Sequence, residues 1–305
     1  MPRYAVIDVG TNSVKFHLAE RPADGAWHCL VDRVEVTRLG EGLQATGGAF
    51  TAAAMDRTAS AIATMVAEAR QHGVADLAAV GTMGLRTAAN REAFIATVAR
   101  QTGLRIEVIP GAEEARLGFV AVQSGLGIAA GPITIFDTGG GSSQFTFGRD
   151  GRVESQFSLN VGAVRFMEAH GLAGAVAPEA LREALAAMAA GLAPLADHPA
   201  PATLVGMGGA VTNLTAVMFG LTTYQPERIQ GARLTRAEVQ RQIELYRTLP
   251  AEARRHIPGL QPKRADIILA GACIVATVMD RLRRDAVIVS DRGLRHGLLV
   301  DRFGR

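Results

Sequence analysis

Two glycine-rich segments of the chain repeat one pattern of chemically useful residues. Residues 8–16 read D-V-G-T-N-S-V-K-F, and residues 137–145 read D-T-G-G-G-S-S-Q-F. In each, an apolar stretch ends in an aspartate, glycines and a serine follow, and a second extended stretch leaves. Glycines allow positive φ and close backbone approach, so their N–H groups can surround a phosphate, while a carboxylate suits Mg²⁺. A tight hairpin with an aspartate turn is the structural alternative.

A second pair of segments repeats in the same order. Residues 80–87 (V-G-T-M-G-L-R-T) and 205–212 (V-G-M-G-G-A-V-T) share V-G-x-x-G-x-x-T. In the later copy, Gly208 and Gly209 stand between a buried strand and a helix whose N-terminus would attract an anion. Close packing of the strand on the helix is the alternative. Two ordered pairs at nearly equal offsets predict two copies of one α/β unit.

Two adjacent carboxylates, Glu113 and Glu114, begin a helix that is expected after the strand ending at Ile109 and Pro110. One of them could orient a water molecule against a phosphoryl group as a general base. Acidic residues in a first helical turn also complement the helix dipole, so the spacing alone leaves both roles open.

The expected strands alternate with helices along the chain, and this alternation predicts sheets whose faces are covered by helices. The strand ends would position the glycine turns and the two glutamates. A strand, not a helix, follows each aspartate–glycine turn, which excludes a dinucleotide fingerprint and a P-loop. The boundary is expected near residues 125–131, giving domains at 1–127 and 128–305. Expected strands lie at 4–9, 14–19, 27–36, 77–80, 106–109, 133–136, 143–147, 152–158 and 203–205, and expected helices at 51–71, 90–100, 162–169, 178–190 and from 211.

Composition sets the class of protein. The chain has 305 residues, of which 48% are apolar and 20% are charged, and its formal net charge is +3. This balance excludes a disordered chain, and two distant cysteines, Cys29 and Cys273, exclude a disulfide scaffold. The longest apolar run, residues 267–279, is shorter than the about 18–20 residues that span a bilayer, so a buried helix is expected there. No signal-peptide pattern is present, so we expect a cytoplasmic protein that binds no membrane.

The basic residues are nearly all arginines, since Lys15 and Lys263 are the only lysines among 32 basic residues. Arginine binds phosphate oxygens bidentately, so this bias fits an anionic ligand, or else a genome rich in arginine codons. The basic clusters lack interleaved aromatic residues, so no nucleic-acid partner is expected. The seven histidines show no metal-ligand spacing, which argues against a zinc site.

These segments resemble those of the exopolyphosphatase / guanosine pentaphosphate phosphohydrolase (Ppx/GppA) family, in family order and over nearly the whole chain. The resemblance implies the α/β fold of the actin/hexokinase/Hsp70 (ASKHA) superfamily. Two ribonuclease-H-like domains would flank an interdomain cleft, with the last helix packing on the first domain. The matching segments are A-V-I-D-V-G-T-N-S (5–13), G-T-M-G-L-R (81–86), G-A-E-E-A-R-L (111–117), D-T-G-G-G-S (137–142), G-A-V-R (162–165), G-M-G-G-A (206–210) and S-D-R-G-L-R (290–295).

The resemblance implies a phosphoric anhydride hydrolase that releases terminal phosphate from inorganic polyphosphate or guanosine pentaphosphate, with Mg²⁺ or another divalent cation. Glu114 would be the catalytic carboxylate that activates water, with Glu113 beside it. Asp8 and Asp137 would hold the metal. The phosphate-binding residues would be Gly10, Thr11, Asn12, Ser13, Arg86, Gly139, Gly140, Gly141, Ser142, Gly208 and Gly209, with Gln144, Lys15 and Arg165 behind them.

The chain departs from the family pattern in two ways. Family members usually carry glutamate in G-G-G-S-T-E, where this chain has Gln144, and a neutral amide cannot supply charge to Mg²⁺ or accept a proton. A weakly catalytic polyphosphate or alarmone sensor is therefore an alternative, as is a sugar or acetate kinase, for which no acceptor motif is present. The chain also lacks the C-terminal helical domains of longer members, so a polymer channel would be shortened or built by a homodimer.

Overall fold

The computed structural model describes residues 1–22, 27–43, 45–128 and 130–304. The chain divides into two compact units, of which the first comprises Met1–Ala121 and Leu294–Arg305 and the second comprises Val122–Gly293. The chain therefore leaves the first unit once and returns to it with its last helix. The division falls inside a helix, whereas the sequence places it after residue 127.

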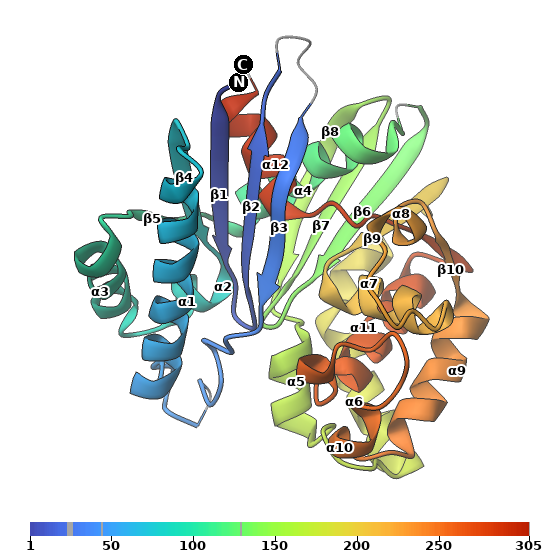
Figure 1. Cartoon of the computed structure of the whole chain (residues 1–305). Coiled ribbons are helices and arrows are strands. Elements are labelled where there is room, and N and C mark those ends of the chain that lie inside the picture. The colour runs from blue at the N-terminus through green and yellow to red at the C-terminus, as the bar shows by residue number, and fades with distance from the viewer. Residues whose placement is uncertain (23–26, 44, 129, 305) are drawn as a thin grey trace. The chain divides into compact units, whose positions relative to one another are not determined.

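The first unit is built on a five-stranded sheet in the order β3-β2-β1-β4-β5 (Figure 1). The first three strands of the chain form antiparallel pairs, and the next two run parallel to the first. The strands are β1 (Arg3–Val9), β2 (Val14–Glu20), β3 (His28–Glu35), β4 (Asp76–Gly81) and β5 (Ile106–Val108).

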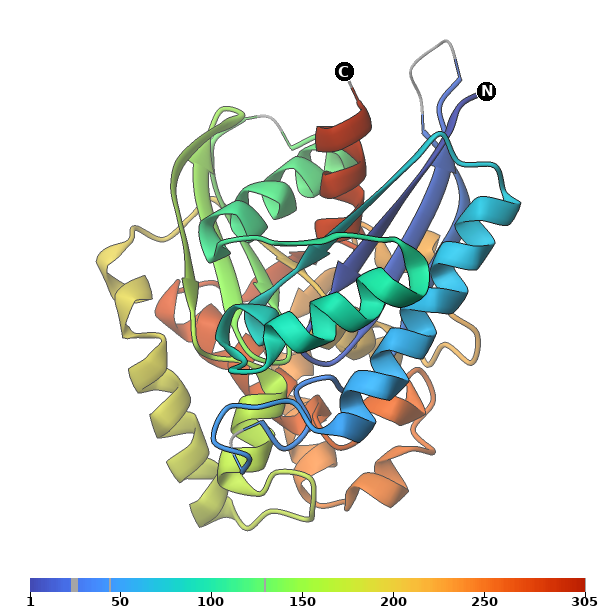
Figure 2. The same cartoon turned by 90° about the vertical axis from the view of Figure 1, so that its left-hand side faces the viewer.

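Helices cover both faces of this sheet, because alternate side chains of an apolar strand point to opposite faces. Odd-numbered residues of β1 pack with α1 (Ala52–Gln71) and α3 (Arg91–Thr102), which lie side by side in Figure 2. Val6 instead packs with α4 (Gly111–Leu126) and α12 (Leu294–Phe303). The even-numbered Asp8 therefore shares the face of α4 and α12. A short helix, α2 (Met83–Thr87), follows β4.

Polar contacts also hold α12 on the sheet. Arg295 donates to both carboxylate oxygens of Asp32 on β3, at 2.6 Å from Nε and 2.9 Å from Nη2. Burial acts to raise the pKa of Asp32, but interactions with His17, His296 and Arg295 together hold that pKa well below its usual range. Burial lowers the pKa of His296 to about 3, so its ring is uncharged at neutral pH.

The second unit is built on a six-stranded sheet in the order β10-β11-β9-β6-β7-β8. Its first three strands are again antiparallel neighbours, and the next parallel strands add to the edge of the first, so the order of the first unit recurs with β10 as an extra strand. The predicted internal repeat is therefore confirmed in the fold. The strands are β6 (Pro132–Thr138), β7 (Ser143–Arg149), β8 (Arg152–Leu159), β9 (Thr203–Met207), β10 (Arg233–Thr235) and β11 (Ala286–Val289).

The core of the second unit surrounds one apolar helix, α11 (Ile268–Arg281), in which every residue from Ile268 to Met279 is buried. The predicted buried helix is thus confirmed. No helix in the described ranges is long and apolar enough to cross a membrane. The other helices are α5 (Ala163–His170), α6 (Pro178–Gly191), α7 (Gly209–Met218), α8 (Pro226–Ile229), α9 (Arg236–Arg247) and α10 (Ala251–Arg254), with short 3₁₀ turns at Ala193–Asp197 and Pro262–Arg264.

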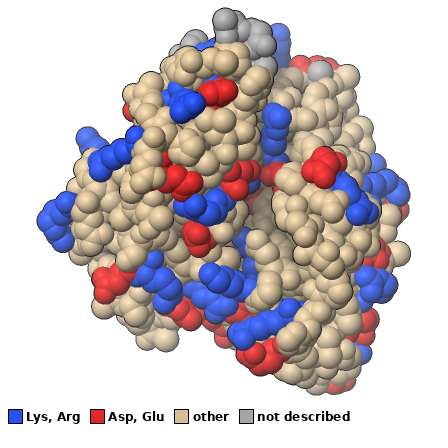
Figure 3. All heavy atoms as spheres, viewed as in Figure 1, with Lys and Arg blue, Asp and Glu red and all other residues tan. Residues whose placement is uncertain are grey.

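Many arginines on helix surfaces pair with a glutamate three residues earlier. Arg241 and Arg247, for example, lie 2.7 and 2.6 Å from Glu238 and Glu244. Exposed pairs of this kind contribute at most about 1 kcal/mol each. Over much of the face in Figure 3, basic and acidic residues lie beside one another. The high arginine content therefore does not by itself locate a ligand site.

Candidate functional site

The turn between β1 and β2 is a tight hairpin, as the sequence predicts. Gly10 N–H donates to the Ser13 carbonyl at 3.0 Å, and the strands pair directly on either side. The side chains of Thr11, Asn12 and Ser13 are buried. Asn12 Nδ2 has no hydrogen-bond partner among the described residues. A buried amide donor without a partner is costly unless a ligand satisfies it, so this hairpin suits an anion.

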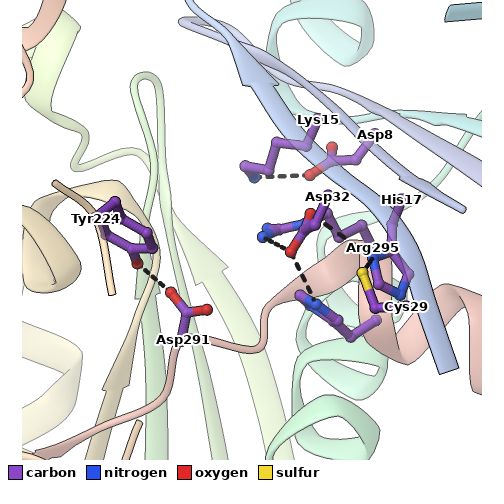
Figure 4. Close-up of polar contacts among 9 residues, drawn as sticks. Asp8, Lys15, His17, Cys29, Asp32, Tyr224, Asp291 and Arg295 are labelled. Atoms are coloured by element: carbon purple, nitrogen blue, oxygen red, sulfur yellow. Dashed lines mark hydrogen bonds and ion pairs between the residues drawn. The ribbon is translucent and has the colours of Figure 1, made fainter. Parts of the chain in front are cut away.

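Asp8 lies at the end of β1, immediately before this hairpin, and is 1% exposed. Its Oδ2 accepts a hydrogen bond from Lys15 Nζ at 2.7 Å (Figure 4). Its Oδ1 has no partner within the described part of the chain. A buried carboxylate oxygen without a partner is the kind of donor that Mg²⁺ binds, so the residues present fit the expected cation.

Arg86 and Glu114 form an ion pair in the same unit. Arg86 Nη1 donates to Glu114 Oε2 at 2.7 Å and to the carbonyl of Ile109 at 3.0 Å. Its Nη2 is buried and has no partner among the residues described. Gly84 allows this position, because a Cβ there would lie only 3.3 Å from Oγ1 of Thr11, so α2 packs closely on the hairpin. Arg86 is thereby held against Glu114 and Ile109, with one buried nitrogen left to bind an anion.

The two adjacent glutamates of α4 differ in their contacts. Both carboxylate oxygens of Glu113 accept from Arg116, at 2.8 and 2.7 Å, and Arg116 also lies 2.9 Å from Asp301. The hydrogen bonds that Arg116 donates to Glu113 raise the pKa of Arg116, even though burial opposes the shift. Glu113 therefore joins α4 to α12, while Glu114 is the carboxylate beside Arg86.

The second glycine turn, between β6 and β7, is a hairpin of the same kind, with Gly139 N–H donating to the Ser142 carbonyl at 2.9 Å. The carbonyl of Gly140 accepts from the backbone N–H of Arg165 at 3.2 Å, at the start of α5. A Cβ on Gly162 would lie 2.5 Å from both the Gly140 oxygen and the Ser142 nitrogen. The G-A-V-R segment thus supports this turn through its backbone.

Gln144 is 2% exposed and lies directly behind the second turn. Its Nε2 donates to Ser142 Oγ at 2.6 Å and to Ser158 Oγ at 3.1 Å. Because the amide of Gln144 is the donor, the hydroxyl oxygens of Ser142 and Ser158 accept these hydrogen bonds. The hydroxyl hydrogen of Ser142 can therefore be donated to another acceptor. A glutamate here would instead accept from these hydroxyls. The substitution therefore changes the direction of hydrogen bonding as well as the charge.

The third glycine segment lies beside Asp137 in the second unit. Gly208 has φ +86°, and a Cβ there would collide with Asp137 Oδ1. A Cβ on Gly209, the first residue of α7, would likewise collide with the guanidinium of Arg264. Burial lowers the pKa of Arg264, against the raising effect of Tyr224, Asp137 and Asp266. The two glycines thus allow a carboxylate and a guanidinium to lie close to the N-terminus of α7.

Arg264 is a candidate functional residue that sequence reasoning missed. It is 8% exposed, and its Nε donates to Gln261 Oε1 at 2.8 Å. Its sequence signal is weak, because nothing in the residues around it distinguishes it from the many other arginines of the chain. Only the fold brings it to Gly209, at a large sequence separation.

Comparisons with known proteins agree with this arrangement. A sequence profile of the Ppx/GppA phosphatase family matches residues 19–305. Exopolyphosphatase 2 of Mycobacterium tuberculosis is 29% identical over 327 aligned residues, covering 100% of this chain and 99% of the relative.

Solved structures agree as well. The Ppx/GppA family member of Aquifex aeolicus superposes with a TM-score of 0.82 at 29% identity, covering 98% of this chain and 97% of that one. An exopolyphosphatase of Cytophaga hutchinsonii superposes with a TM-score of 0.90 at 25% identity, covering 97% and 96%. The expected ribonuclease-H-like units of the actin-like superfamily are thus confirmed, and the chain belongs to the Ppx/GppA phosphatase family.

Proposed function

We propose that the chain releases terminal phosphate from inorganic polyphosphate. The observation that carries this proposal is the Arg86–Glu114 pair, in which Arg86 Nη2 is buried and has no partner among the described residues. The names of the relatives support the substrate class, because the Mycobacterium tuberculosis and Cytophaga hutchinsonii proteins are called exopolyphosphatases.

In this proposal Arg86 holds an oxygen of the terminal phosphoryl group through Nη2, and orients Glu114 through Nη1. Glu114 accepts a hydrogen bond from a water molecule and so aims it at the phosphorus. The water oxygen forms a bond to phosphorus, the bridging P–O bond breaks, and the shortened chain leaves with the bond electrons. Glu114 takes the water proton. Because phosphoryl transfer needs little base strength, positioning is the main contribution.

The glycine turns would bind the remaining phosphoryl oxygens through backbone N–H groups, with Asn12 Nδ2 and the Ser142 hydroxyl as side-chain donors. Asp8 and Asp137 are the proposed carboxylates for Mg²⁺, which when bound would neutralise phosphoryl charge. Lys15 holds Asp8 in place through its hydrogen bond. Arg165 supports the second turn through its backbone.

The test compares Glu114→Gln with the matched control Glu113→Gln, using phosphate release from long-chain polyphosphate in the presence of Mg²⁺. Glu114→Gln is expected to lower kcat by about 10²–10⁴-fold, the usual contribution of a positioned general base. Glu113→Gln is expected to keep most of the activity, because its carboxylate is committed to Arg116. Equal activity of the two variants would refute the assignment of the base.

Guanosine pentaphosphate is the second substrate to assay, since it presents a phosphoryl chain of the same chemistry. A higher kcat/KM for guanosine pentaphosphate than for polyphosphate would make guanosine pentaphosphate the main substrate. The roles proposed for the residues of the site would stay the same. Binding of either polyanion without phosphate release would instead support a sensor and overturn the proposed hydrolysis.

A further inference from the structure

A cluster of potential metal ligands lies in the first unit and has no part in the proposed phosphoryl chemistry (Figure 4). Its centre is formed by His17 on β2, Asp32 on β3 and His296 on α12, and Cys29 on β3 lies beside His17. His17 is buried, His296 is partly buried, and Cys29 is exposed. The cluster therefore has a closed inner side and an open outer side.

The backbone brings these side chains to one face of the sheet. His17 and Asp32 are direct partners across the antiparallel β2–β3 pair, and direct partners point to the same face. Cys29 is three residues from Asp32, which in a regular strand would put it on the opposite face. A register shift between Leu18 and Ala19 pairs Cys29 with Ala19 instead, and this returns it to the face of His17.

The distances between donor atoms fit a single ion. His17 Nδ1 lies 3.7 Å from Asp32 Oδ1, His296 Nε2 lies 3.4 Å from Asp32 Oδ2, and Cys29 Sγ lies 3.9 Å from His17 Nδ1. Zinc–ligand bonds of about 2.0–2.3 Å in a tetrahedron separate neighbouring donors by about 3.3–3.8 Å. The donor atoms of His17, Asp32 and His296 all lie within 4.8 Å of one another, and Cys29 Sγ would complete the set by moving closer to them.

We infer that His17, Cys29, Asp32 and His296 form a binding site for a transition-metal ion of the zinc class. Two imidazoles, a thiolate and a carboxylate are the donors that Zn²⁺ takes at tetrahedral sites. The donor set differs in kind from the oxygen ligands proposed for Mg²⁺ at Asp8 and Asp137. The ion would join α12 to β2 and β3, so its role is structural.

Arg295 does not exclude a cation here, although it donates to both oxygens of Asp32. An ionised carboxylate offers about four lone-pair sites, so two remain for an ion. Hydrogen bonds to a ligating carboxylate are the usual way in which its orientation is fixed. The thiolate of Cys29 would supply a second negative charge, so that together with Asp32 it balances the charge of a divalent ion.

The sequence gives no sign of this site, because the ligands come from three elements and the two histidines stand at opposite ends of the chain. The expectation against zinc rests on short spacings alone. Such spacings detect only sites made within one loop or helix.

The test uses the full chain after chelator treatment, with Zn²⁺ and Co²⁺ as probes. Wild type is expected to bind one equivalent of Co²⁺ with a thiolate-to-cobalt charge-transfer band, and Zn²⁺ is expected to raise its melting temperature. Cys29→Ser should lose the band and bind at least about tenfold more weakly. Because Cys29 is exposed, this variant should fold normally. His296→Gln should weaken binding equally.

His256→Asn is the matched control, since His256 is exposed and lies outside the cluster. This variant should keep the band, the stoichiometry and the melting shift. Cobalt bound by the carboxylates Asp8 and Asp137 alone would give no thiolate band. Wild type that binds no metal, or binding that is unchanged in Cys29→Ser, would overturn the site.

Discussion

Gly162→Ala should separate the structure of the second glycine turn from its function. Gly162 has φ −145°, which any residue adopts, so the variant is not strained by its own backbone conformation. The new Cβ would lie 2.5 Å from the Gly140 oxygen and the Ser142 nitrogen, whereas ordinary contact begins at 3.4 Å. Since these neighbours are backbone atoms, the turn itself has to move, by about 1 Å.

The expected cost has two parts. Overpacking of this kind lowers the free energy of unfolding by about 1–3 kcal/mol, which leaves a domain of this size folded. A displacement of about 1 Å at a substrate-positioning group can lower turnover by about 10²-fold. We therefore expect a modest loss of stability together with a large loss of kcat/KM for polyphosphate.

Thermal unfolding and phosphate release would be measured on the same preparation. Gly174→Ala is the matched control, because a Cβ at Gly174 meets nothing within 4 Å. It should leave both quantities near wild type. Gly162→Ala with reduced stability but wild-type kcat/KM would refute the placement of substrate at the second turn.

Three further predictions follow from buried groups. Gln144→Glu should lower the Mg²⁺ concentration needed for half-maximal phosphate release severalfold, because a carboxylate supplies negative charge that an amide lacks. An unchanged Mg²⁺ titration would contradict this expectation. Arg254→Met should lower the free energy of unfolding, measured in urea, by at least about 3 kcal/mol, because the fully buried guanidinium donates to four backbone carbonyls. Replacing the exposed Arg255 by alanine should change this free energy by less than about 1 kcal/mol. After chelator treatment, a thiol reagent should label Cys29 but not Cys273 in the folded protein from about pH 7 to about pH 9, because burial raises the pKa of Cys273 to about 12. Equal labelling of both cysteines would show that α11 opens readily.

The predictable part of the fold was the part with strong local patterns. The strands and helices expected up to residue 211 occur with bounds within two residues of those observed. These elements were predictable because each consists of an apolar stretch, and glycines often mark its end. The strands β10 and β11, of three and four residues, were not predicted, although the equally short β5 was. The helix α9 was also missed, because few of its residues are apolar and its surface is highly charged.

The same contrast holds for the candidate site. Both aspartate–glycine hairpins follow from the sequence, because strand, turn and strand are neighbours along the chain. The different partners of Glu113 and Glu114 could not be predicted, since which of them meets Arg86 depends on the packing of α2 against α4. The position of Arg264 beside Gly209 likewise depends on contacts far apart in sequence.

The return of α12 to the first unit has a consequence for synthesis on the ribosome. Val6 and Val80 are covered by Leu294 and Leu298, which are made only after the whole of the second unit. At about 5–20 residues per second, the last helix emerges about 15–60 s after β1. The contiguous second unit can therefore complete its core first, while one face of the first sheet is covered only by α4 and stays partly open to chaperones or misassembly. Truncations within residues 294–305 should accordingly harm the N-terminal sheet more than the second unit.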